Sequence, residues 1–159
     1  LLICVLISRC HADDEITHET YRDESWVGVN LDVKVDGTLT CSTPFKYAIL
    51  FEELDDFHFT NDVIDSIDTT SSEDKLSVKY EVKGVAKDIE WFQDYVEPRI
   101  VFYHNCGTDS LGRKGCVCKE WSVDQGFWKT LNVNLESTEL QRCDTCDHLD
   151  KFDFEKKKK

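Results

Sequence analysis

The clearest alternation of apolar and polar residues lies in the segment Trp26–Cys41. Apart from Gly37, every odd position from 27 to 41 holds Val, Leu or Cys, and most even positions are polar. A period of two places these side chains on one face of a β-strand, which we expect to be buried. Asp36 and Gly37 predict a turn or bulge that bends the strand without changing its register.

Further strands are predicted before residue 98. Phe45–Leu54 carries apolar residues at both parities, which predicts a strand covered on both faces. Asp62–Thr69 predicts a weaker strand, and Lys75–Val82 alternates cleanly until Gly84 interrupts the pattern. Val85–Glu97 fits either a short edge strand or one helical turn.

Arg99–Cys106 and Cys116–Val123 predict the two strands of a β-hairpin. Both segments contain many β-branched and aromatic residues, and turn-forming residues rich in glycine separate them. Phe127–Leu135 predicts a last strand. About seven short strands, with regular turn signals and no strong amphipathic helix, are typical of an all-β sandwich.

Length and charge narrow the functional class. The chain has 159 residues, which is the size of one domain with a core of its own. The formal net charge of −13 argues against general nucleic-acid binding, because phosphate contacts need a basic surface. The charge fits a soluble protein of an extracellular fluid.

The first residues have the character of a secretory signal. Residues 1–12, LLICVLISRCHA, form an apolar run that ends in small residues, and we expect cleavage after Ala12. The run is too short to cross a bilayer. Asp13–Ser25 is polar and predicts a flexible lead-in. The alternative is an internal fragment with a buried apolar segment.

The cysteines support the prediction of export. Cys4 and Cys10 lie in the leader, and an even number remains in the mature chain, which predicts disulfide bonds. These six are Cys41, Cys106, Cys116, Cys118, Cys143 and Cys146. Paired strands would hold the cysteines at the two ends of the hairpin turn together, so we expect a Cys106–Cys116 bridge.

A zinc site is the alternative use of these residues. Cys116 and Cys118 could join Cys143 and Cys146, with His104 and His148 nearby, and paired thiolates are a known zinc-binding pattern. Because the signal sends the chain to an oxidising compartment, we favour disulfides and expect no metal.

Other polar residues predict no catalytic site. His104 lies in the middle of a strand without an identifiable nucleophile or acid-base partner, so we expect a buried histidine that is hydrogen-bonded to a neighbour. The acidic residues Glu52, Glu53, Asp55 and Asp56 could bind calcium, but they lack the spacing of a calcium loop. We expect a solvated acidic loop there.

Five aromatic residues form a candidate contact patch. They are Phe57, Phe59, Trp91, Phe92 and Tyr95. Exposed aromatic side chains beside charged residues are typical of contact surfaces. The alternative is that these residues pack in the core or cap an open end of the sandwich.

Several short motifs resemble the nematode transthyretin-like family. They are VKVDGTLTC at Val33–Cys41, VFYHNC at Val101–Cys106, the following Cys116, and LNVNLESTELQRC at Leu131–Cys143. The resemblance covers about residues 27–144. It implies a secreted, transthyretin-like (immunoglobulin-like) β-sandwich over residues 26–144, stabilised by a hairpin disulfide and followed by a polar tail at 145–159.

Within that sandwich we expect two more disulfides. Cys41 ends the first strand and Cys143 follows the last, so these two should pair, which leaves Cys118–Cys146. Because Cys116 and Cys118 share one parity, either of them could bind Cys106, and we favour Cys116.

The resemblance favours a binding protein over an enzyme. The hydrolase relatives of transthyretin carry histidines near the first strand, which has none here, so we expect no enzymatic activity and no cofactor. We expect a secreted module whose loops contact an extracellular protein or a cell-surface partner. The alternative is a carrier of a small apolar ligand or lipid. A carrier needs an apolar pocket, whereas a filled core with an exposed aromatic patch favours the module.

Overall fold

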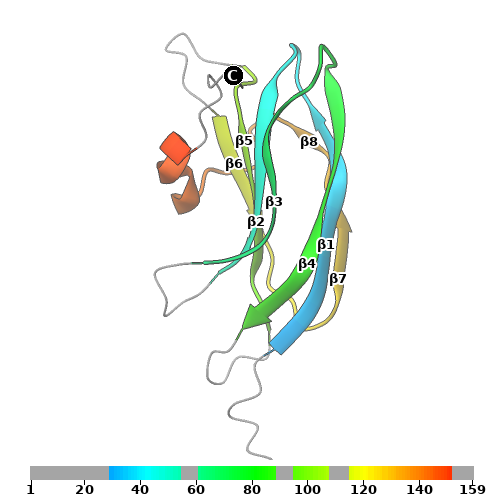
Figure 1. Cartoon of the computed structure of the whole chain (residues 1–159), viewed down its shortest axis with the longest axis vertical. Helices are drawn as coiled ribbons and strands as arrows, with labels where there is room; N and C mark the ends of the chain where they lie inside the picture. The colour runs from blue at the N-terminus through cyan, green and yellow to red at the C-terminus, as the bar shows by residue number, and fades with distance from the viewer. Residues whose placement is uncertain (1–28, 55–60, 89–94, 108–114, 152–159) are drawn as a thin grey trace, which may run out of the picture.

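The structure of the chain is a computed structural model that describes residues 29–54, 61–88, 95–107 and 115–151. In these ranges the chain forms two β-sheets that face each other, without an α-helix (Figure 1). The predicted all-β sandwich is therefore confirmed. Within the described ranges no helix has the length and apolar character that a membrane crossing requires.

The first sheet is built around β1 (Val29–Thr40). This strand pairs along its whole length with antiparallel β4 (Ser77–Asp88). On its other side it pairs in parallel with β7 (Phe127–Thr130) and β8 (Val133–Asn134). The segment Phe127–Leu135, which was predicted as one last strand, thus forms two short strands with a break between them.

The second sheet has the order β3-β2-β5-β6, with every pair antiparallel. Its strands are β3 (Asp62–Ser71), β2 (Lys46–Glu53), β5 (Pro98–His104) and β6 (Gly115–Glu120). The pairing of β5 with β6 confirms the two strands of the predicted hairpin, whose turn at 108–114 lies outside the described residues.

The core lies between the sheets. Val33, Val35 and Leu39 of β1 are almost fully buried, which confirms the face predicted from the alternation. Tyr80 from β4 packs edge-to-face on Phe102 from β5, with ring centroids 5.3 Å apart. Side chains from both sheets therefore interdigitate across the sandwich.

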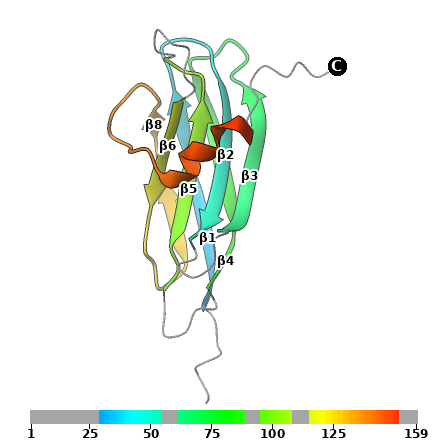
Figure 2. The ribbon, with the colours of Figure 1, turned by 90° about the vertical axis from the view of Figure 1, so that its left-hand side faces the viewer.

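The second sheet is also covered on its outer face. A 3₁₀-helix, η2 (Asp144–Lys151), lies across the outer face of this sheet, in front of β2, β5 and β6 (Figure 2). A second buried cluster there includes Ala48, Val101 and Tyr103. Burial on both faces confirms the prediction for β2, and the segment predicted as a polar tail begins with this packed helix.

Two glycines were assigned the wrong role from the sequence. Gly37 forms no bulge, because β1 and β4 stay in continuous register past it. A Cβ at Gly37 would lie 2.0 Å from the carbonyl oxygen of Leu131, so glycine allows that backbone to approach. Gly84 does not end β4; a Cβ there would lie 2.7 Å from a methyl group of Ile64.

Candidate functional site

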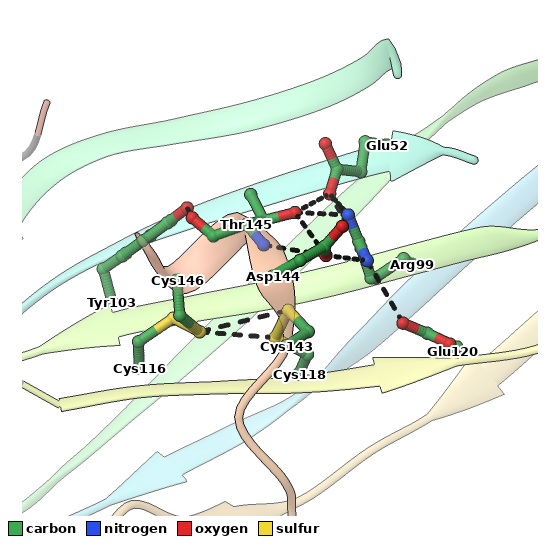
Figure 3. A network of polar contacts seen from close by, with 10 residues as sticks. All are labelled: Glu52, Arg99, Tyr103, Cys116, Cys118, Glu120, Cys143, Asp144, Thr145 and Cys146. Atoms are coloured by element: carbon green, nitrogen blue, oxygen red, sulfur yellow. Dashed lines mark hydrogen bonds and ion pairs between the residues drawn. A yellow bond between two sulfur atoms is a disulfide. The ribbon is translucent and has the colours of Figure 1, made fainter. Parts of the chain in front are cut away.

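The most elaborate polar arrangement among the described residues surrounds Arg99 (Figure 3). Arg99 lies on β5, and its side chain is 4% exposed on the outer face of the second sheet. Its Nε and Nη2 atoms each lie 2.8 Å from Oε1 of Glu52 on β2. Its Nη1 atom donates to Asp144 at 2.7 Å and to Glu120 at 3.2 Å. One guanidinium therefore joins β2, β5, β6 and η2.

Thr145 completes this arrangement. Its hydroxyl accepts a short hydrogen bond from Nη2 of Arg99 and donates to Glu52 at 2.9 Å. The hydroxyl of Tyr103 donates to the carbonyl oxygen of Thr145 at 3.2 Å. The start of η2 is therefore hydrogen-bonded to both central strands of the sheet.

In this arrangement Arg99 brings one positive charge to three carboxylate groups. Burial by itself would lower the pKa of Arg99, but the attraction and hydrogen bonds of Glu52, Glu120 and Asp144 outweigh burial and raise it. Arg99 in turn overcomes the desolvation of Asp144 and lowers the pKa of that carboxyl group. Every nitrogen of the guanidinium has a protein acceptor, so the arrangement holds η2 and leaves no free donor for a ligand.

Four cysteines lie next to the Arg99 arrangement, and we call them the outer cysteine cluster. They form the disulfides Cys116–Cys146 and Cys118–Cys143, which attach η2 and the residue before it to β6. Sγ of Cys146 also lies 3.6 Å from Sγ of Cys118 and 3.9 Å from Sγ of Cys143. The predicted Cys118–Cys146 bridge is wrong, although these two sulfurs are near neighbours.

The third disulfide, Cys41–Cys106, joins the end of the first sheet's central strand to the end of β5. Both cysteines belong to the core between the sheets. Cys116 instead lies on the outer face of the second sheet, opposite Tyr103 in the ladder. The predicted Cys106–Cys116 bridge is wrong because the two side chains leave the sheet on opposite faces.

The predicted Cys41–Cys143 bridge is wrong for the same geometric reason. Cys41 is directed into the core, and Cys143 lies beyond the second sheet, on its outer face. All six cysteines of the predicted mature chain are nevertheless in disulfides, as the even number predicted.

His104 is buried, as predicted, but the described residues include no side chain that is hydrogen-bonded to its ring. Its side chain is 3% exposed, and neither ring nitrogen has a hydrogen-bond partner among the described residues. The ring lies against Gly115, where a Cβ would be 2.1 Å from Cε1 of the imidazole. Burial lowers the pKa of His104 to about 4, and the backbone of Cys106 opposes this only partly.

The predicted acidic loop begins inside the sheet. Glu52 and Glu53 are buried residues of β2, 4% and 0% exposed. Asp55 and Asp56 lie outside the described residues. The prediction of a solvated loop is therefore wrong for the two glutamates. The sequence alone gave no sign that Arg99 pairs with Glu52.

The candidate contact patch falls mostly outside the described residues. Phe57, Phe59, Trp91 and Phe92 belong to the ranges that the structure does not describe. Tyr95 is half-buried.

The sequence analysis missed Trp128 on β7. It is 78% exposed, the most exposed of the large apolar side chains described. It lies beside Lys34 on the outer face of the first sheet. The alternation of Phe127–Leu135 already contained this signal, because Trp128 has the parity of the outward-facing Asn132.

A surface hollow of about 540 Å³ lies on the same face. It is lined by Asp36, Gly37, Thr38, Lys79, Tyr80, Glu81, Thr130 and Asn132. Charges of both signs meet here, since Lys34 lies 2.7 Å from Glu81 and 3.6 Å from Asp36. The hydrogen bond from Lys34 is the main reason that the pKa of Glu81 falls to about 2.

Comparison with known proteins adds no assignment to this geometry. No family model, no curated protein and no solved structure matches the chain.

Proposed function

We propose that the chain is a secreted, non-enzymatic binding module with a transthyretin-like β-sandwich, which contacts an extracellular protein or a cell-surface partner. One observation carries this proposal: side chains of both sheets, such as Tyr80 and Phe102, pack directly on one another across the described part of the sandwich. A ligand therefore has little room inside the sandwich, and recognition has to use the outside. This argument favours the module over a carrier.

The covalent framework supports export. Three disulfides hold the described domain, and such bonds persist in oxidising compartments. One disulfide joins the two sheets, and two attach η2 to the outer face. A framework of this kind keeps an exposed surface in one conformation, which lowers the entropic cost of binding.

Trp128 is the described residue best suited to contact a partner. A largely exposed tryptophan offers a large apolar area together with an indole N–H donor. Aromatic anchors of this kind dominate the energy of protein interfaces. Lysines and carboxylates alternate around it, whereas an anionic membrane would favour an excess of lysine. We therefore favour a protein partner on this face, in addition to the loops.

Binding of the labelled, oxidised protein to cells and extracellular fluid of the source organism tests the proposal. We expect saturable binding that Trp128→Ala weakens about tenfold or more, because an interface anchor is worth about 2 kcal/mol. Val63→Ala is the matched control, since Val63 is an exposed apolar residue (63%) on the other sheet. This variant should bind like the unchanged protein.

Two outcomes would contradict the proposal. The first is that the oxidised protein binds no more strongly than the reduced, alkylated chain, which would contradict a folded binding module. Extraction of the natively purified protein with organic solvent could instead release one apolar molecule per chain, which would favour the carrier.

A further inference from the structure

We propose that the outer cysteine cluster has a second state: when its two disulfides are reduced, Cys116, Cys118, Cys143 and Cys146 bind one Zn²⁺ through four thiolates. The site lies on the outer face of the second sheet, away from Trp128. The inference is therefore independent of the proposed binding function.

The positions of the sulfurs fit a tetrahedral site. With Zn–S bonds of about 2.3 Å, neighbouring sulfurs of a four-thiolate site lie about 3.8 Å apart. Sγ of Cys146 is already 3.6 Å from that of Cys118 and 3.9 Å from that of Cys143. The sulfurs of Cys116, Cys118 and Cys146 all lie within 4.8 Å of one another. For the four sulfurs to surround one ion, the two bonded pairs have to separate and Cys143, which is not one of these three, has to approach Cys116.

The backbone keeps the two members of each cysteine pair, Cys116 with Cys118 and Cys143 with Cys146, close to each other without the disulfides. Cys116 and Cys118 leave β6 on the same face, as the period of a strand requires. Cys143 and Cys146 belong to one turn, in which the N–H of Cys146 donates to the carbonyl oxygen of Cys143 at 3.1 Å. This two-residue separation is the spacing of many structural zinc sites.

Contacts that contain no sulfur attach the turn to the sheet. The Arg99 ion pair to Asp144, the hydrogen bond from Tyr103 to Thr145, and the backbone bond from Cys118 to Gln141 all remain after reduction. The four ligands therefore stay close enough to bind an ion in the reduced protein.

The surroundings suit a closed, structural zinc site. Cys116, Cys118 and Cys146 are buried, so water has little access to a fourth coordination position. Cys143 is half-buried and, with Cys118, borders a surface hollow of about 350 Å³ through which an ion can enter. Arg142 donates to the carbonyl oxygen of Cys146 at 3.1 Å and places a positive charge near the anionic site.

The atoms and charges balance when the two disulfides are reduced and the four thiols then bind zinc. A water-soluble phosphine reduces each disulfide: the phosphine gains the oxygen atom of one water molecule, and two thiols form. Binding of Zn²⁺ then releases the four thiol protons and leaves a site with a charge of minus two.

Titration of the phosphine-reduced full chain with Co²⁺ tests the site, with Cys4→Ser and Cys10→Ser present in every sample. We expect one Co²⁺ per chain, with the charge-transfer and visible bands of tetrahedral four-thiolate coordination, and displacement by one equivalent of Zn²⁺. The oxidised chain should bind neither ion, because its sulfurs are bonded to each other.

Paired variants separate this site from the rest of the chain. Cys116→Ser/Cys146→Ser should weaken binding by more than about 100-fold, because two of four ligands are lost. Cys41→Ser/Cys106→Ser is the matched control and should bind as before. Cys143→His should still bind one ion, with the spectrum of three sulfurs and one nitrogen.

Three results would overturn the proposal. They are no stoichiometric binding by the reduced chain, equal loss in the two double variants, and equal Co²⁺ binding by the oxidised chain. Far-ultraviolet circular dichroism of each sample reports whether the β structure is retained. A reduced chain that has lost its β signal and binds no ion counts against the site.

Discussion

At the scale of single residues, His104 is a buried ring that the sheet keeps neutral. Its two nitrogens lack partners among the described residues, so protonation would place an uncompensated charge in the interior. This explains why the pKa of His104 falls from its ordinary value of 6.5 to about 4. Above pH 6.5 the ring is neutral in both the folded and the unfolded chain, so its titration adds no pH dependence to the stability there.

The first prediction concerns acid stability. Between pH 6.5 and pH 4 the unfolded chain binds a proton at His104 that the folded chain refuses, so stability falls as the pH falls. The difference in pKa corresponds to about 3 kcal/mol at the acid end of the window. His104→Leu should retain its stability at neutral pH and lose this part of the pH dependence, measured by urea unfolding.

The ion-paired carboxyl group of Glu81 does not contribute to this window. Glu81, with a pKa of about 2, stays ionised throughout it. A pH profile of His104→Leu that follows that of the unchanged protein would show that another group is responsible.

The second prediction concerns Arg99. Arg99→Met leaves Glu52 buried without its counter-charge, which costs about 3–5 kcal/mol for a buried pair. Replacing both residues, Arg99→Met with Glu52→Leu, should recover much of that loss, because both charges of the buried pair are removed together. Urea unfolding of the two variants measures the difference.

Arg142→Met is the matched control for Arg99. Arg142 pairs with Asp147 at 3.3 Å on the surface, and exposed pairs contribute less than about 1 kcal/mol. An equal loss in Arg142→Met and Arg99→Met would contradict a special role for the buried pair.

At the scale of elements, the strands follow the alternation of side chains. The period of β1 was readable because one of its faces is buried and the other is exposed to solvent. The positions at which the strands break could not be predicted from the sequence. Gly37 and Gly84 look like breaks in a local pattern, yet each lies inside a strand where another segment approaches closely.

The third prediction tests that explanation at Gly37. Gly37→Ala should destabilise the protein by about 1–3 kcal/mol, because the new methyl group meets the backbone of Leu131 at 2.0 Å. Gly126→Ala is the control, since its Cβ would meet only the carbonyl oxygen of Asp32, at 3.8 Å. Thermal unfolding of both variants decides the matter, and similar melting temperatures would contradict the steric argument.

At the scale of the whole molecule, the disulfides divide by face. Cys41–Cys106 links the two sheets through the core, and the outer cysteine cluster fastens η2 to the second sheet. Sequence spacing suggested a bridge across the hairpin, because it shows which cysteines are near each other along two paired strands. It does not show which face each cysteine occupies once β5 has ended.

The fourth prediction is the disulfide map of the oxidised protein after trypsin digestion. Peptide 35–46 should be joined to peptide 100–113, and peptide 115–119 should be joined twice to peptide 143–151. Mass spectrometry before and after reduction detects both products. A product that joins 100–113 to 115–119 would instead support the hairpin bridge.

The sequence by itself determined the class of this protein: strand positions, a buried face on β1 and an even set of cysteines all depend on local periodicity and composition. The tertiary structure alone decided the disulfide partners, the ion pair of Arg99 with Glu52, and the exposure of Trp128. These features join residues that are distant in the chain, such as Arg99 and Glu52, which lie 47 positions apart. Which of them meet is determined by the pairing of strands, which places Glu52 opposite Arg99 in the β2–β5 ladder, and by the packing of the two sheets and of η2.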